Sequence, residues 1–140
     1  MRLYLQDIGR VDLLTSEEEV TLARLVQRRE ALLKQQRELS DTNPAIGELH
    51  RLEDLQRREA NHHSHWPTKQ EWARAAGLTL QELQSRIDAG YEAWADKAAI
   101  DAKELKVSLR NGRRAKDHMI QANLRLVVAV AKKYQQRGME

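Results

Sequence analysis

The segment ANLRLVVAVAKKYQQRG, residues 122–138, has the spacing of an amphipathic helix with two apolar stripes. The first stripe consists of Met119, Ala122, Leu126, Val127, Val130 and Tyr134, and the second of Ile120, Leu124, Val128 and Ala131. A helix that is apolar on two sides needs neighbours on two sides. The segment therefore predicts a helical protein in which the last helix is packed on one side and has a second apolar side for another element.

Composition favours the same fold class. The chain has 140 residues, about one ordinary domain, with 32% charged and only 4% aromatic residues. Abundant Leu, Ala, Arg, Glu and Gln favour helices, and no strand pattern or internal repeat is found. We predict an all-α helical bundle of about six helices.

The absence of cysteine excludes disulfides, thiolate nucleophiles and cysteine zinc sites. The longest apolar run, residues 126–131, is too short to cross a membrane, and no secretory segment opens the chain. These features predict a soluble, intracellular protein that has no membrane partner.

Charge is unevenly distributed along the chain. Residues 103–140 contain ten Lys and Arg but three acidic residues, although the whole chain carries a net charge of +3. Such a segment suits a phosphate backbone or an acidic protein surface. A solvated helix face explains the charge equally well.

Caps and helix breakers divide the chain. Leu3, Tyr4 and Ile8 indicate a short first helix, and a long amphipathic helix follows at about 16–39. Thr15 or Ser16 caps that helix, because a glutamate stands three residues after each. We expect a loop at 40–47, helices at about 48–60, 68–76 and 80–95 with a loop at 61–67, and a last helix at about 113–137.

Three candidate sites have structural explanations that we favour. The cluster of His62, His63 and His65 could bind a metal, but no carboxylate or cysteine has the right spacing, so a solvated loop is preferred. Residues 68–87 have the turn of a helix-turn-helix, yet their second helix carries only one basic residue, Arg86, which favours a packing module. The acidic residues 17–19 suit a helix start. We predict no enzyme, no cofactor and no metal.

Two blocks of the sequence together resemble the housekeeping-type sigma factors of bacterial RNA polymerase, the sigma-70 family. The block RLYLQDIGRVDLLTSEEEVTLAR, residues 2–24, resembles region 1.2. The block RRAKDHMIQANLRLVVAVAKKYQQRG, residues 113–138, resembles region 2.1, and residues 67–83 between them resemble the versions found in cyanobacterial and plastid sigma factors. This resemblance implies region 1.2-like helices at 1–39, a variable helical module at 40–112 and a region 2.1-like helix at 113–140, together a truncated sigma domain 2.

The resemblance also implies sites for single-stranded promoter DNA of the non-template strand. The last thymine of the minus-ten element, once unstacked, is expected in a pocket that joins the two blocks and consists of Leu13, Glu17, Glu19, Asn123, Arg125 and Leu126. The discriminator bases are expected at Arg2, Tyr4, Leu5 and Gln6. Leu5 and Gln6 stand where many members have Met and Arg, which leaves a guanine preference open.

By this resemblance the chain is a sigma factor fragment, and its parent protein confers promoter recognition and melting on RNA polymerase core in the cytoplasm, at the bacterial nucleoid rather than in a plastid stroma. We expect the exposed last helix to support self-association of the fragment. Two other functions remain open from the residues alone: a helical adaptor that binds an acidic protein, and a free-standing helix-turn-helix DNA-binding module.

Overall fold

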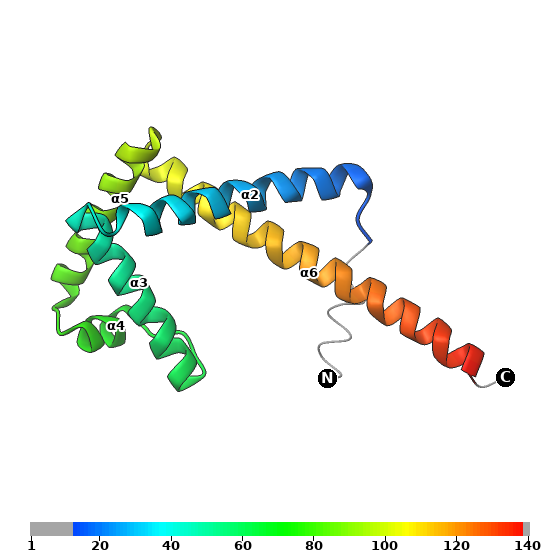
Figure 1. Cartoon of the computed structure of the whole chain (residues 1–140). Helices are drawn as coiled ribbons and strands as arrows, with labels where there is room; N and C mark the ends of the chain where they lie inside the picture. The colour runs from blue at the N-terminus through cyan, green and yellow to red at the C-terminus, as the bar shows by residue number, and fades with distance from the viewer. Residues whose placement is uncertain (1–12, 139–140) are drawn as a thin grey trace. The chain divides into compact units, whose positions relative to one another are not determined.

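The computed structural model describes residues 13–138 and shows a chain of helices (Figure 1). The described part contains α2 (Ser16–Leu39), α3 (Pro44–His63), α4 (Lys69–Ala76), α5 (Leu80–Ala98) and α6 (Ala102–Gly138). No strand occurs in these residues, so the all-α prediction is confirmed. The short helix expected near Leu3–Ile8 lies outside the described residues. None of the described helices is both long and apolar enough to span a membrane.

Contacts between residues divide the chain into two compact units. Unit 1 consists of the residues up to Arg29 and those from Ser108 onward, and unit 2 consists of Glu30–Val107. Helices α2 and α6 are therefore each divided between the two units, with one portion in unit 1 and the other in unit 2. The segmentation at residues 39 and 112 that the sequence suggests stays a prediction.

Unit 2 has an aliphatic and aromatic core shared by all its helices. Trp94 of α5 is fully buried at its centre, and Trp72 of α4 donates its indole N–H to the carbonyl oxygen of Leu52 at 2.8 Å. A buried indole N–H usually has such a partner, although that of Trp94 has none among the described residues. The other buried apolar residues of the unit are Leu32, Ile46, Leu49, Leu52, Ala73, Leu83, Ile87, Ala95 and Leu105.

Helices α3 and α5 approach each other closely at Gly90. A Cβ placed on Gly90 would collide with the Cβ of Leu49 and would lie 3.0 Å from the carbonyl oxygen of Ala45. Only a residue without a side chain allows the two helices this separation. Gly90 is consequently a packing residue, and its position fixes where α5 crosses α3.

Side-chain caps begin the two short helices of unit 2. Thr68 caps α4 and Thr79 caps α5, each in a capping box with the glutamate three residues later, Glu71 and Glu82. The hydrogen bonds from the threonines lower the pKa of both glutamates, because they favour the charged carboxylate. These contacts contribute stability above the unfolded pKa near 4.5, and this contribution is lost as the pH falls through the lowered folded values.

The structure corrects three helix boundaries. The sequence predicts a loop at 40–47, but α3 already begins at Pro44. The Asn43 side chain caps this helix, and proline suits the first helical position because the backbone N–H there has no partner within the helix. The expected loop at 61–67 is wrong at its start, since α3 continues to His63. The last helix starts at Ala102 instead of near 113, and Asp101 Oδ1 accepts from the Glu104 N–H at 2.6 Å.

We expect Gly90→Ala to destabilise the chain by roughly 1 kcal/mol. Overpacking costs about 1–3 kcal/mol, and the better helix propensity of alanine returns up to about 1 kcal/mol. Chemical denaturation followed by circular dichroism measures the difference. The control is Ala89→Ser on the same helix, where the side chain is exposed and the expected change is within about 0.5 kcal/mol. Equal stability of Gly90→Ala and the wild-type chain would contradict the close crossing.

We expect Ala99→Gly to stabilise the chain by about 0.4–1 kcal/mol. Ala99 ends α5 with a φ of 58°, in the left-handed region that glycine adopts without steric cost. Thermal unfolding measures the gain. The matched control, Ala89→Gly within the same helix, should instead lower stability by about 0.5–1 kcal/mol, because there glycine only loses helix propensity. If both substitutions changed the stability in the same direction, the left-handed C-cap at Ala99 would be wrong.

Candidate nucleic-acid interface

The start of α2 presents carboxylates in a fixed arrangement. The Thr15 hydroxyl accepts from the Glu18 N–H at 3.2 Å, and the Glu18 carboxylate accepts from the Thr15 N–H at 3.3 Å. This reciprocal pair is a capping box, so of the two caps that the sequence allows, Thr15 is the one formed. Glu18 is therefore used by the cap, whereas the exposed Glu17 and Glu19 on either side of it remain for other partners.

Within unit 1, α2 packs against α6 at Gly112. A Cβ on Gly112 would collide with the Cβ of Arg29 and would lie 2.8 Å from the carbonyl oxygen of Leu25. The predicted packing of the long helix near 16–39 on the last helix is thus found. Gly112 had no role in the sequence analysis, and the signal that could have found it is a lone glycine inside a helical pattern.

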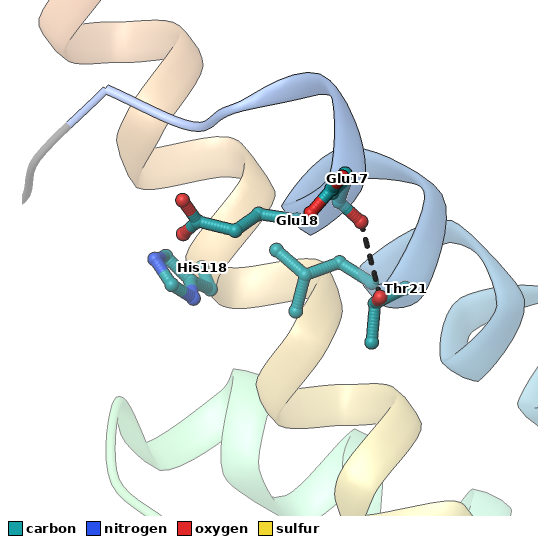
Figure 2. A pocket seen from close by; sticks show the side chains of 5 residues that line it. Glu17, Glu18, Thr21 and His118 are labelled. Atoms are coloured by element: carbon teal, nitrogen blue, oxygen red, sulfur yellow. Dashed lines mark hydrogen bonds between the residues drawn. The ribbon is translucent and has the colours of Figure 1, made fainter.

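An open pocket lies between the first turns of α2 and the middle of α6 (Figure 2). It is lined by Glu17, Glu18, Thr21, Leu22 and His118. Thr21 donates its hydroxyl to the Glu17 carbonyl oxygen at 3.0 Å, and Glu18 extends toward the imidazole of His118. The pocket is lined by carboxylates, an imidazole and the side chain of Leu22, so it offers both hydrogen-bond acceptors and an apolar surface. His118 is a lining residue that the sequence analysis did not select.

The residues expected to hold the thymine are mostly accessible in the structure. Glu17 lines the pocket of Figure 2, while Asn123 is exposed and stands five residues after His118 on α6. Leu13 and Leu126 expose 53% and 50% of their surface, Arg125 is half-buried and Glu19 is exposed. Two leucines this exposed are available to a ligand. The close approach of Glu17 or Glu19 to Asn123 stays a prediction.

The expected discriminator residues, Arg2, Tyr4, Leu5 and Gln6, lie outside the described residues. The basic side chains of α6 are described as far as Lys133. From residue 113 onward, those that are exposed are Arg113, Arg114, Lys116, Lys132 and Lys133. They spread over about 20 residues of one helix and suit contacts with phosphates, which position a nucleic acid without reading its sequence.

The other candidate sites have structural roles in the described chain. His63 pairs with Glu59 at 3.2 Å, and no group of three His, Asp or Glu between residues 13 and 138 is placed to hold a metal ion. Arg86, the basic residue of the second helix in the helix-turn-helix pattern, is bound to Glu48 at 3.1 Å. The hydrogen bond from Arg51, and to a lesser extent that from Arg86, lowers the pKa of Glu48. These contacts agree with a packing module in α4 and α5.

Comparison with known proteins gives one family. Residues 1–32 match the model of sigma-70 factor, region 1.2. The chain is 44% identical to the RNA polymerase sigma-C factor of Nostoc sp. strain PCC 7120, over 100% of this chain and 34% of that protein. It is 41% identical to the sigma factor SigA2 of Synechococcus elongatus, over 100% of this chain and 31% of that protein. No solved structure matches.

A further relative is the probable RNA polymerase sigma-C factor of Synechocystis sp., 40% identical over the whole chain and 35% of that protein. The chain thus spans about a third of the length of these relatives, all of them cyanobacterial. The alignments cover both blocks that the sequence analysis singled out and the module between them. Over its entire length this chain is thus similar to RNA polymerase sigma factors of the sigma-70 family, and its residues 1–32 match region 1.2 of that family.

Proposed function

We propose that the protein containing this chain directs RNA polymerase to promoters and helps to melt them at the start of transcription. The observation that carries the proposal is the alignment of the entire chain with proteins named RNA polymerase sigma factors. Core polymerase is accordingly its proposed partner, the cytoplasm its proposed location, and its proposed role is binding without catalysis.

The proposed DNA site is a pocket for one unstacked thymine. Its members are Leu13, Glu17, Glu19, Asn123, Arg125 and Leu126. A flipped pyrimidine offers a ring N–H to a carboxylate, a carbonyl oxygen to an amide, and a flat face to leucines. The accessible carboxylates of α2 and the exposed amide of Asn123 have this chemistry, and Leu13 and Leu126 have exposed apolar surface.

Only one of the two glutamates is expected to meet the base. Glu17 and Glu19 are two residues apart on a regular helix, so they point to different sides of α2. Glu17 lines the pocket toward α6, which makes it the better candidate for contact with a base held against that helix. Glu19 would then serve the helix dipole at the start of α2.

We further propose that the segment preceding residue 13 contacts the discriminator bases through Arg2, Tyr4, Leu5 and Gln6. A glutamine amide pairs with adenine, whereas an arginine guanidinium pairs with guanine. Gln6 therefore supports an adenine-tolerant contact at this position of the chain.

The 140-residue chain by itself should self-associate through α6. The apolar α6 patch, defined as Ile120, Leu126, Val127, Val130 and Tyr134, exposes between 46% and 77% of each side chain. Contiguous apolar surface of this kind marks an interaction site on soluble proteins. In the intact protein the same patch is available to other parts of the sigma factor or to the polymerase.

In the full-length protein bound to core polymerase, Asn123→Ala should weaken open-complex formation by about 1–3 kcal/mol, the cost of losing a hydrogen-bond partner in a desolvated site. The loss should shrink when the last thymine of the minus-ten element is replaced by another base. Open-complex formation is measured by permanganate footprinting on promoters that differ at this base.

The control for Asn123→Ala is Lys133→Ala, an exposed cation on the same helix. It should reduce binding evenly across promoter sequences and make the binding less sensitive to salt, because a lysine neutralises phosphates. An Asn123→Ala defect of the same size with every base at that position would show that the amide is structural, and the thymine pocket would then be wrong.

We expect the 140-residue chain to form dimers or larger species at high concentration, and Val127→Glu to shift it toward monomer. Val127 is 62% exposed within the apolar α6 patch, so a carboxylate there meets an apolar neighbour in the associated state. Sedimentation velocity measures the association of the wild-type chain and of the Val127→Glu variant. Gln135→Glu adds the same charge at an exposed polar position and should leave the association unchanged. A wild-type chain that stays monomeric would exclude this surface as a self-association site.

A further inference from the structure

Besides the pocket of unit 1, the structure has a pocket in unit 2, between α3, α4 and α5. It contains no residue of the proposed thymine pocket. Its apolar walls are Leu49 of α3, Trp72 of α4 and Ile87 of α5. Glu53 and Tyr91 add a carboxylate and a phenol. All three helices belong to the same compact unit, so the pocket is part of one packed core. Pockets with apolar walls and a few converging polar groups are typical ligand sites.

The Glu53 carboxylate is held in one orientation. One oxygen accepts from the Gln36 side-chain amide at 2.6 Å, and the other accepts from the Tyr91 hydroxyl at 3.2 Å. Gln36 is only 4% exposed, and its own oxygen meets His50 Nδ1 at 3.2 Å. Burial and the neighbouring Glu53 charge raise the pKa of Tyr91, so its hydroxyl remains a donor at physiological pH. The carboxylate is thus preorganised by a buried amide and a phenol.

Both partners of Glu53 are neutral, although the carboxylate is half-buried. Within residues 13–138 no Lys or Arg forms an ion pair with it. Buried charges in proteins are ordinarily paired. A carboxylate also has about four acceptor positions, and Gln36 and Tyr91 occupy two. Glu53 therefore has both the charge and the acceptor capacity to receive a cation.

Two lysines near the pocket residues contact other groups. Lys69, which lines the pocket, donates to the Gln84 side-chain oxygen at 2.7 Å. Lys106 has its ammonium 5.0 Å from the centre of the Tyr91 ring, and this ring also stacks on Trp94. The Tyr91 ring is consequently occupied, and the hydroxyl is the part of this residue that serves the pocket.

We propose that this pocket binds an alkylguanidinium or alkylammonium group, with its cation on the Glu53 carboxylate and its alkyl stem along Trp72 and Ile87, which keep 6% and 8% of their surface exposed. Arginine and lysine side chains have this chemistry, since they bury their methylene stems while their charged ends pair. Free small cations have it too. The proposal is independent of the promoter function, because no residue of the thymine pocket takes part.

The test uses the folded 140-residue chain, labelled with ¹⁵N, and the indole N–H signal of Trp72 as the reporter. Butylguanidinium and butylammonium should shift this signal saturably at millimolar concentration, whereas the neutral n-butanol should not. The exposed Trp66 should stay unshifted. Equal shifts with n-butanol, or no saturable shift with either cation, would overturn the proposal. This comparison needs no variant, so it holds whatever a substitution does to folding.

Two substitutions and one control then identify the group that binds the cation. Glu53→Gln should weaken butylguanidinium binding at least ~10-fold, the loss of about 1.4 kcal/mol, while Glu59→Gln, which removes a carboxylate of α3 outside the pocket, should leave it unchanged. Lys69→Met should strengthen binding a few-fold by removing a like charge. Weaker binding to Lys69→Met, or unchanged binding to Glu53→Gln, would rule out a cation at Glu53.

A last comparison distinguishes the source of the cation. An acetylated and amidated Gly-Arg-Gly peptide should bind more tightly than butylguanidinium if the site takes an arginine of a protein partner, and no more tightly if it takes a free small cation. Either result supports the shared chemistry. A peptide that fails to bind while butylguanidinium binds would restrict the site to free cations.

Discussion

Both units depend on a helix crossing at which a glycine lets two backbones approach. In unit 1 the crossing joins α2 and α6 at Gly112, and in unit 2 it joins α3 and α5 at Gly90. At each point a methyl group would overlap the facing helix, so the separation of the axes is set by the missing side chain. The residues around the crossings then pack at fixed positions, including Leu49 and Trp94 in unit 2 and Leu25 in unit 1.

The two units use their apolar residues differently. Unit 2 encloses most of them: Trp72 and Trp94 are nearly or fully buried, whereas Trp66 and Leu80 remain exposed. In unit 1 the second half of α6 leaves valines, a leucine and a tyrosine exposed. A long helix with exposed apolar residues next to exposed lysines is suited to binding other surfaces, whereas a closed core is suited to stability. The exposed apolar residues of unit 1 suit the proposed binding role, and the closed core of unit 2 suits a packing role.

Polar residues distinguish the two candidate binding sites. At the start of α2, Glu17 and Glu19 flank a carboxylate that the helix cap already uses, and they face solvent. Glu53 instead lies half-buried, with each oxygen fixed by a neutral donor. An exposed carboxylate adapts to a ligand that other residues position. A fixed, half-buried carboxylate selects a ligand by charge, because leaving it unpaired is costly.

The sequence alone determined the helical class, the bounds of α2 and the family resemblance, because these depend on local signals: capping spacings, helical periodicity and two blocks of sequence, residues 2–24 and 113–138, that resemble sigma-70 factors. It failed where a local signal has two meanings. Pro44 and Gly47 indicate a loop by composition but begin a helix here, since Asn43 supplies the cap. Only the tertiary structure decided the roles of Gly90, Gly112, His118 and Glu53, because each depends on a residue distant in sequence.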